Sequence, residues 1–310
     1  MAMTPGELRQ HLGRGALLSF PVTPFTAQGE LDLPALRAHI AYLLAHRPDG
    51  LFVCGGTGEF VALSFAEWRS AVAAAVEEVG GAVPVVAGCG YGAAIAREYL
   101  RAAEAAGCDG VLLLPPYLTL AEQEGLYQHY AAILEGARIG AVIYQRDNAV
   151  FTAPTVARLA ALPPLAAFKD GLGEVERLQR IALATEGRLP LLNGLPTAEI
   201  SQPALGAVGA NSYSSAVFNF VPELALQFYR AWRTGDREAQ GRLLDSFYRP
   251  FCELRERRRG YAVSLIKAGL RLCGRSCGPV RAPLVEVSAP HEQELAALLR
   301  ANGVATPADG

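Results

Sequence analysis

Lysine is scarce in this sequence. Of its 28 basic residues, two are lysine, Lys169 and Lys267, and the remaining 26 are arginine. A guanidinium stays protonated and cannot condense with a ketone, whereas a neutral lysine amine can do so. The scarcity makes each lysine a candidate for amine chemistry, and an ordinary cationic role remains the alternative for both.

Patterns typical of disulfide or metal chemistry are missing. The six cysteines include no CxxC pair, and most of them lie in apolar runs, which indicates buried and reduced thiols. The five histidines show neither HxH nor HExxH spacing. A metal site built on histidine is therefore not expected.

Long apolar runs and a strong excess of charge are also missing. No run approaches the roughly 20 apolar residues that span a bilayer, and the first 15 residues lack the apolar centre of a signal peptide. The formal net charge is −2, which argues against a nucleic-acid partner. We therefore expect a cytoplasmic protein that binds neither membranes nor nucleic acids.

Short β-type runs alternate with helical segments along most of the 310 residues. Eight such β–α repeats within about 220 residues match a closed (β/α)8 barrel. An open doubly wound sheet is the alternative, but no GxGxxG follows the first strand. The expected strands are 15–22, 49–55, 83–89, 109–115, 140–145, 164–170, 189–194 and 209–215.

The helical segments between these strands have apolar residues at helical spacing. Ser64 and Glu67 form a capping-box pattern at the start of one of them. The fold class expected is α/β, a (β/α)8 TIM barrel over residues 1–235 with a helical C-terminal extension over residues 236–310 packed on it. The expected barrel helices are 32–46, 65–79, 93–106, 121–136, 153–161, 173–186, 197–205 and 217–233, and those of the extension are 239–257, 261–273 and 290–301.

The active site of such a barrel lies at the carboxyl ends of its strands. Lys169 ends the sixth strand, where a lysine is costly unless it is deprotonated, paired or functional. Tyr144 ends the fifth strand, one repeat earlier, so that phenol and amine can meet. The alternatives are an ion pair of Lys169 with Asp170 and an ordinary core role for Tyr144. Lys267 lies in a helical segment, where a snorkelling or paired lysine is expected.

Two further segments carry groups that suit a carboxylate ligand. Gly56, Thr57 and Gly58 follow the second strand, where backbone N–H groups and a hydroxyl can bind an anion. An ordinary glycine-rich turn is the alternative. Arg146 follows the fifth strand and could hold a carboxylate or pair with Asp147. Candidates at other strand ends, for substrate hydroxyls or a distal carboxylate, are Ser19, Asn193, Asn211, Ser212 and Ser214.

The order of these features resembles a known group of enzymes. A GGTGE loop (55–59), a tyrosine ending strand five and a lysine ending strand six are similar to the dihydrodipicolinate synthase and N-acetylneuraminate lyase superfamily. The resemblance covers nearly the whole chain and is closer to its 5-dehydro-4-deoxyglucarate dehydratase branch. The segments similar to that branch are LLSFPVTPF (17–25), YQRDNAVF (144–151), FKDGLGE (168–174), NGLPTAE (193–199), YSSAVFNFVP (213–222), GYAVSLIKAG (260–269) and GPVRAPL (278–284).

The resemblance implies an activity and an assembly. The activity is conversion of 5-dehydro-4-deoxy-D-glucarate to 2,5-dioxopentanoate, water and CO2 through a lysine Schiff base, without a metal or organic cofactor. The usual assembly is a homotetramer. We hypothesise that Lys169 forms the imine, that Tyr144 and Thr57 relay protons, and that residues 56–58 hold the α-carboxylate.

The chain departs from the synthase branch at three places. Gly56 stands in place of a threonine, Ala149 in place of an arginine, and Tyr117–Leu118 in place of a double tyrosine that reaches a neighbouring subunit's site. Arg146 is the candidate to replace the missing arginine. Two other functions remain open: an aldolase, lyase or synthase of the same superfamily acting on another 2-keto acid, and a non-catalytic barrel that senses a metabolite.

Overall fold

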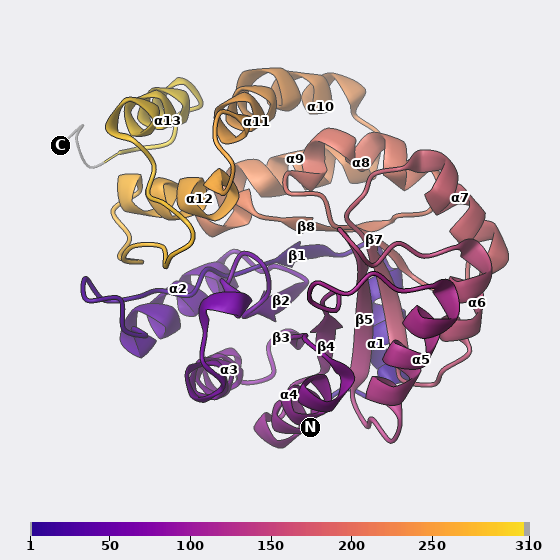
Figure 1. The fold of residues 1–310 in the computed structure, drawn as a ribbon. Helices are drawn as coiled ribbons and strands as arrows, with labels where there is room; N and C mark the ends of the chain where they lie inside the picture. The colour runs from indigo at the N-terminus through magenta and orange to yellow at the C-terminus, as the bar shows by residue number, and fades with distance from the viewer. Residues whose placement is uncertain (1, 307–310) are drawn as a thin grey trace.

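The computed structural model describes residues 2–306 and contains a closed barrel of eight parallel strands (Figure 1). Neighbouring strands pair in sequence order, and the last strand pairs with the first to close the sheet. The prediction of a (β/α)8 barrel is therefore confirmed. The strands are β1 (Leu17–Ser19), β2 (Gly50–Val53), β3 (Val85–Cys89), β4 (Gly110–Leu113), β5 (Gly140–Gln145), β6 (Leu165–Asp170), β7 (Leu191–Asn193) and β8 (Ser212–Ser215).

Helices that follow the strands form the outer layer of the barrel (Figure 1). The capping box predicted at Ser64 and Glu67 is present, with each side chain accepting from the other residue's backbone N–H. The expected helix 217–233 starts as a 3-10 turn, and its regular part begins at Pro222, whose fixed φ suits a first turn. The layer comprises α2 (Leu33–Ala45), α3 (Phe65–Val79), α4 (Ala93–Ala106), α5 (Gln123–Leu134), α6 (Ala153–Ala160), α7 (Val175–Ala184), α8 (Ala198–Ala207) and α9 (Pro222–Thr234).

Side chains along each strand alternate between the helical layer and the barrel lumen. One buried cluster contains the outward residues and the helix faces that pack on them. The other fills the lumen with apolar side chains below the mouth. The lumen is therefore a packed core, and only groups near the carboxyl ends of the strands can meet a ligand. The strand residues of the lumen cluster include Leu18, Phe52, Val86, Leu112, Val142, Tyr144 and Leu192.

A helix that the sequence analysis did not predict, α1 (Pro5–Gly13), closes the amino-terminal end of the barrel. Thr4 and Glu7 form a capping box at its start, a signal present in the sequence. Its Leu8 and Leu12 are fully buried in the lumen cluster. A Cβ at Gly140 would lie 2.6 Å from a Leu8 methyl, so this glycine makes room for the plug.

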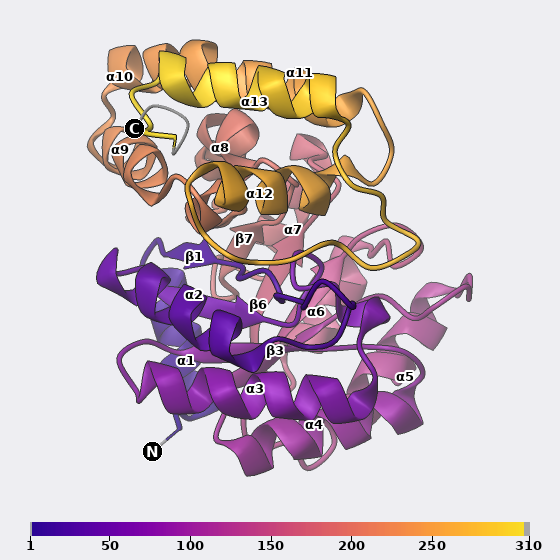
Figure 2. The same ribbon diagram turned by 90° about the vertical axis from the view of Figure 1, so that its left-hand side faces the viewer.

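The C-terminal extension is helical, as predicted, and lies on one side of the barrel (Figure 2). The helix expected at 239–257 is present as one continuous helical segment over residues 237–256, which contains a π-helical turn. The segment forms α10 (Arg237–Leu243), a π-helical turn, η3 (Leu244–Tyr248), and α11 (Arg249–Glu256). Pro250 lacks an N–H, and its ring would meet a carbonyl one turn earlier, which accounts for the wider turn before it. Then follow α12 (Tyr261–Leu272) and α13 (Ala289–Ala301).

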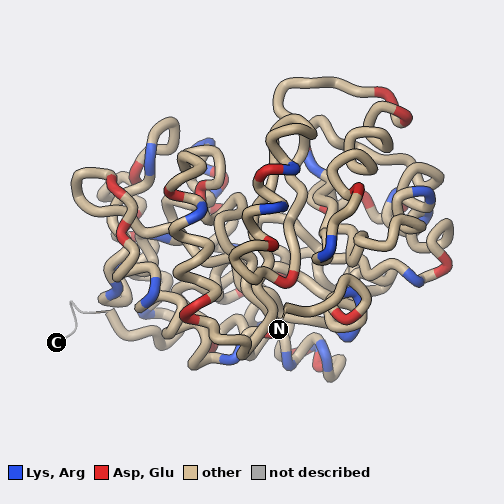
Figure 3. Tube along the Cα trace, turned by 90° about the horizontal axis from the view of Figure 1, so that it is seen from below, with Lys and Arg blue, Asp and Glu red and all other residues tan. Residues whose placement is uncertain are grey.

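We retain residue 235 as a proposed boundary between barrel and extension; residues 1 and 307–310 of these two parts lie outside the described residues. Charges of both signs are interspersed along the chain trace (Figure 3). In the part of the chain that the structure describes, no helix is long and apolar enough to cross a bilayer.

The plug formed by α1 predicts a stability effect. Leu8→Ala should lower the free energy of unfolding by about 2–5 kcal/mol, because it opens a cavity in the closed end of the lumen. Urea unfolding followed by circular dichroism measures the change. Leu183→Ala is the matched control, since Leu183 is 69% exposed, and should change stability by less than about 0.5 kcal/mol. Equal midpoints for the two variants would contradict the role of α1.

Candidate active site

Lys169 lies on the lumen side of β6, because its neighbour Phe168 packs outward against the helices. The residue is only 3% exposed. Its Nζ lies 3.3 Å from the carbonyl oxygen of Gly194, on the loop after β7. Lys169 makes no ion pair with Asp170, whose carboxylate accepts hydrogen bonds from Gln145 and the Gly173 N–H. The structural ion pair considered as an alternative is therefore absent at these two residues.

Tyr144 meets Lys169 at the mouth of the barrel. The two residues are direct partners in the pairing of β5 with β6. The Tyr144 hydroxyl donates to the Gly194 carbonyl at 2.7 Å, and the Lys169 Nζ lies 3.8 Å from the centroid of the Tyr144 ring. Phenol and amine thus share one backbone acceptor. The expectation that one βα repeat would bring them together holds in the geometry.

The surroundings favour the neutral form of both groups. Burial lowers the pKa of the Lys169 amine well below its usual value, the Arg146 charge lowers it further, and Asp170 opposes these effects. Burial raises the pKa of the Tyr144 phenol, against the opposing charge of Arg146. A neutral amine can act as a nucleophile, and a neutral phenol can donate a proton.

The glycine-rich segment after β2 forms a compact turn at the same end of the barrel. The Glu59 N–H donates to Gly56 O at 3.1 Å, and the hydroxyl of Thr23 donates to Gly58 O at 2.7 Å. Gly56 is exposed, Thr57 is half-buried and Gly58 is buried. The turn is therefore held from below by Thr23 while its outer part stays accessible to a ligand.

Arg146 begins a tight turn after β5. Its backbone N–H and carbonyl pair with those of Ala149, so that the small residue is buried beneath the turn. The guanidinium is 46% exposed and lies 3.1 Å from the Asp147 carboxylate. Arg146 directly follows Gln145, the last residue of β5, so it stands at the carboxyl end of the strand that carries Tyr144, and its charge acts on the pKa of both Tyr144 and Lys169. The surface pair with Asp147 and a contact with a ligand carboxylate are compatible, because exposed ion pairs exchange readily.

Ser214 remains a candidate ligand among the five weaker ones. It pairs in register with the lumen residue Leu18, and its hydroxyl donates to Asn193 O at 3.3 Å, one residue before the Gly194 carbonyl. The expectation that Ser19 and Asn193 bind substrate is wrong, because both side chains point out of the lumen. Ser19 follows Leu18, and the amide of Asn193 is used within the loop and start of α8, donating to Ala198 O, Ser201 and Gln202.

The expectation that Asn211 and Ser212 bind substrate is wrong for a different reason. They stand before and at the first residue of β8, which is the closed end of the barrel and not its mouth. The Ser212 hydroxyl donates to Leu12 O and accepts from the Ala16 N–H, so it fastens α1 to the sheet. The expected strand 209–215 begins three residues later, at Ser212, so Asn211 and Ser212 stand at its amino-terminal end and not inside it.

Gly194 and Phe20 are site residues that the sequence analysis missed. Gly194 supplies the shared carbonyl, and the Phe20 ring lies 5.0 Å from Nζ of Lys169. The signal for Gly194 was present, since a glycine directly follows the seventh strand, where a backbone can approach a ligand closely. Phe20 carried no such signal, because an aromatic residue near a strand end is normally core.

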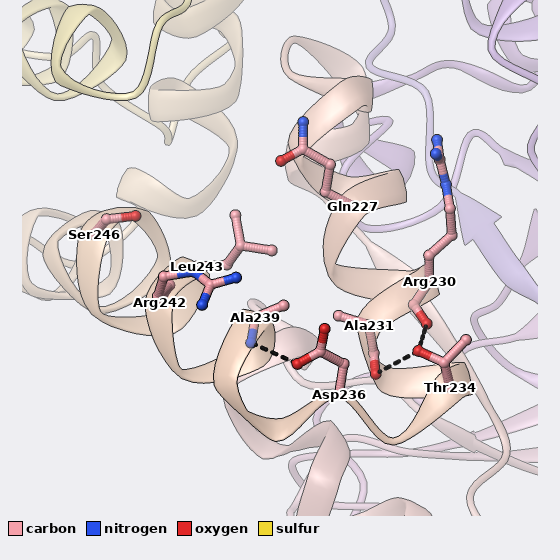
Figure 4. Close-up of a pocket in the computed structure, with 9 residues that line it drawn as sticks. All are labelled: Gln227, Arg230, Ala231, Thr234, Asp236, Ala239, Arg242, Leu243 and Ser246. Atoms are coloured by element: carbon pink, nitrogen blue, oxygen red, sulfur yellow. Dashed lines mark hydrogen bonds between the residues drawn. The ribbon is translucent and has the colours of Figure 1, made fainter.

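A separate cleft of about 410 Å3 lies between α9 and α10 (Figure 4). Its polar groups form hydrogen bonds within the two helices. The Asp236 carboxylate accepts the N–H of Ala239 at the start of α10, and the Thr234 hydroxyl donates to Arg230 O in α9. This cleft lies on the outer helices, away from the amine and phenol at the mouth. Within residues 2–306, no three His, Cys, Asp or Glu side chains gather where they could hold a metal ion.

A buried amine beside a phenol at the mouth of a (β/α)8 barrel is typical of enzymes that form imines with keto substrates. The sequence profile of the dihydrodipicolinate synthetase family matches residues 14–302. This chain belongs to that family.

The curated relatives and solved structures agree with this membership. The chain is 51% identical to a probable 5-dehydro-4-deoxyglucarate dehydratase of Streptomyces griseus over 90% of this chain and 88% of the relative. It is 50% identical to one of Saccharopolyspora erythraea, covering 95% and 94%. Its fold matches the crystal structure of dihydrodipicolinate synthase from Bacillus clausii with a TM-score of 0.89 and 28% identity, over 95% of this chain and 100% of that chain.

The shared carbonyl predicts a sensitive position. A methyl group at Gly194 would lie 2.5 Å from Nζ and 2.7 Å from Cγ of Lys169, so Gly194→Ala should displace the amine. The rate of borohydride-trapped adduct formation with a 2-keto acid should fall by about 10²-fold, the scale of a misplaced reacting group. Intact-mass spectrometry measures the adduct. Gly241→Ala, a site with open space around it, is the control and should react normally. Normal adduct formation by Gly194→Ala would remove Gly194 from the site.

Proposed function

We propose that this protein is a decarboxylating 5-dehydro-4-deoxyglucarate dehydratase. It converts 5-dehydro-4-deoxy-D-glucarate to 2,5-dioxopentanoate, water and CO2 through an imine on Lys169. The observation that carries the proposal is the buried Lys169 amine, which has no carboxylate partner among residues 2–306 and lies beside the Tyr144 phenol. The names of the relatives at 46–51% identity supply the substrate.

The first step is attack of the neutral Lys169 amine on the substrate ketone, with loss of water from the carbinolamine. Tyr144 and Thr57 move the protons, and the protonated imine then acts as an electron sink. Removal of a proton from the adjacent CH2 gives an enamine, which expels the hydroxyl on the next carbon. The protonated imine nitrogen takes up the electron pair that each bond cleavage releases, and the burial of Lys169 strengthens this stabilisation.

Decarboxylation follows dehydration in this scheme. Before water is lost, the carbon that bears the distal carboxylate is not conjugated with the imine. Afterwards a C=C bond links the two, so the electrons of the breaking C–C bond can reach the imine nitrogen as CO2 leaves. Protonation and hydrolysis of the imine then release the aldehyde product and free Lys169.

Two anion contacts orient the substrate. The backbone of residues 56–58 and the Thr57 hydroxyl hold the α-carboxylate next to the ketone. Arg146 holds the distal carboxylate while the imine forms and water is lost, and Ser214 contacts a substrate hydroxyl. The exposure of Arg146 and the inward direction of Ser214 support these two roles.

We also propose the setting that the resemblance implies, a homotetramer in the cytoplasm that acts on a small keto acid and binds neither nucleic acid nor membrane. The loop after β4 supports self-association, because it carries three apolar side chains that are largely exposed, Tyr117, Leu118 and Leu120.

Product analysis tests the function. The protein should release CO2 and 2,5-dioxopentanoate from 5-dehydro-4-deoxy-D-glucarate, detected as gas and by mass spectrometry. Lys169→Arg should abolish turnover while the protein stays folded, because a guanidinium keeps the charge but cannot form the imine. Peptide mapping should place a borohydride-reduced adduct on Lys169. Release of pyruvate would indicate an aldolase, and an adduct on Lys267 would exclude the mechanism. Binding of the keto acid without any adduct would favour the metabolite-sensing barrel.

Arg146 predicts a change in affinity. Arg146→Ala should weaken substrate binding by about 1.5–3 kcal/mol, the value of a lost charged hydrogen bond. Steady-state kinetics should show this as a raised KM. Arg180→Ala is the matched control, since that arginine pairs with Glu176 on the exposed face of α7, and its KM should not change. An unchanged KM in Arg146→Ala together with a lower melting temperature would mean that Arg146 is structural.

A further inference from the structure

The strand-two loop meets two segments of the C-terminal extension, to which the proposed function gives no role, at one buried carboxylate. Glu59 is the last residue of the GGTGE loop. Its Oε1 lies 2.7 Å from Nζ of Lys267 on α12. Its Oε2 accepts the backbone N–H of Arg281 at 2.9 Å. The side chains of Glu59 and Lys267 are 1% and 0% exposed. The strand-two loop is thus joined to the two motifs GYAVSLIKAG and GPVRAPL of the C-terminal extension.

Glu59 needs such a hold because its backbone is in an unfavourable conformation. Its φ is +53°, in the left-handed region that costs a residue with a side chain about 1 kcal/mol or more. Its N–H closes the turn on Gly56 O. The side chain that anchors Glu59 therefore also fixes the turn that carries residues 56–58.

The segment after α12 forms a strap over the loops at the mouth. Figure 2 shows this segment running past the ends of α2 and α3 before α13 begins. The Phe25 N–H donates to Cys277 O, and Gly278 has a φ of +63° with Phe25 O in the place that a Cβ would need. The Arg281 guanidinium donates to Gly29 O, to Ala62 O and to the Glu67 carboxylate.

The geometry of this contact explains why Lys267 is a lysine in a chain that otherwise uses arginine. The ammonium of Lys267 reaches two oxygens, Glu59 Oε1 and Pro279 O, each at 2.7 Å, and lies 4.3 Å from the centroid of the Phe25 ring. A planar guanidinium is larger and presents its donors in a fixed fork. Since a buried ion pair adds little net stability compared with apolar packing, the contact is better explained by the geometry that it imposes.

We propose that Lys267 and Arg281 are positioning residues that act through Glu59 to hold the strand-two loop in its carboxylate-binding shape. The extension thereby sets the preference of the site for substrates with a carboxylate next to the ketone. This inference rests on the proposed function, which assigns the α-carboxylate to residues 56–58. It predicts an effect on affinity for that carboxylate and not on the amine chemistry of Lys169.

The test compares two ketones that differ in the carboxylate. Pyruvate and acetone are each incubated with borohydride, and the concentration that gives half-maximal trapping on Lys169 is read from intact mass and peptide maps. Glu59→Gln should raise this concentration for pyruvate by about tenfold, the scale of one weakened charged contact, and for acetone by less than about twofold. Arg281→Gln removes the guanidinium contacts with Gly29 O, Ala62 O and Glu67 that fix the strap, and with it the backbone N–H that binds Glu59, so it should shift the ratio in the same direction. Glu238→Gln, in an exposed pair with Arg242, is the matched control and should leave both values unchanged.

The outcomes separate the inference from the proposed function. If the unaltered protein forms no adduct on Lys169 with either ketone, the imine mechanism itself fails. If it forms both adducts and the variants keep the normal pyruvate-to-acetone ratio, the positioning role is overturned, whatever their melting temperatures. Equal losses for both ketones would likewise overturn it, because they would mean a general distortion of the barrel mouth. A selective loss for pyruvate in the folded variants supports it.

Discussion

The candidate active site depends on the Gly194 carbonyl, because this oxygen accepts hydrogen bonds from both the Tyr144 hydroxyl and the Lys169 amine. One acceptor with two donors fixes the distance between the phenol and the amine without placing a charge beside either. A carboxylate in the same position would bind Lys169 as an ion and raise its pKa. The nearest acid, Asp170, is instead occupied by Gln145 and a backbone N–H. The neutral backbone acceptor thus keeps the amine available as a nucleophile.

The two lysines illustrate how burial can have opposite consequences. Both are almost completely removed from water. Lys267 has the Glu59 carboxylate at 2.7 Å, and the attraction opposes the lowering of its pKa by burial. No carboxylate in the described part of the chain pairs with Lys169, and the charge of Arg146 lowers the pKa of its amine further. Whether a buried lysine is a structural cation or a candidate nucleophile therefore depends on the charge of the neighbouring side chain and not on how deeply the lysine is buried.

The barrel also divides its polar residues by end. Ser212 and Asp109 bind backbone groups at the closed end, around α1. The residues proposed for chemistry lie at the carboxyl ends of the strands, where loops and the C-terminal strap surround them. This arrangement separates the groups that stabilise the sheet from the groups that meet substrate.

Patterns in the sequence were enough to predict the eight-stranded barrel, the helical extension and the meeting of Tyr144 with Lys169. Each of these follows from a local period or from the spacing of one βα repeat. The sequence did not determine which face a strand residue occupies, because alternation assigns residues to two faces without showing which face is the lumen; Ser19 and Asn193 lie next to the lumen residues Leu18 and Leu192 and therefore point outward. It also could not place Asn211 and Ser212, since their position depends on where β8 starts. The shared Gly194 carbonyl and the Glu59–Lys267 contact could be seen only in the folded structure. The first joins residues 25 positions apart through a backbone atom, and the second joins residues 208 positions apart through buried charges. Neither kind of contact leaves a periodic pattern in the sequence.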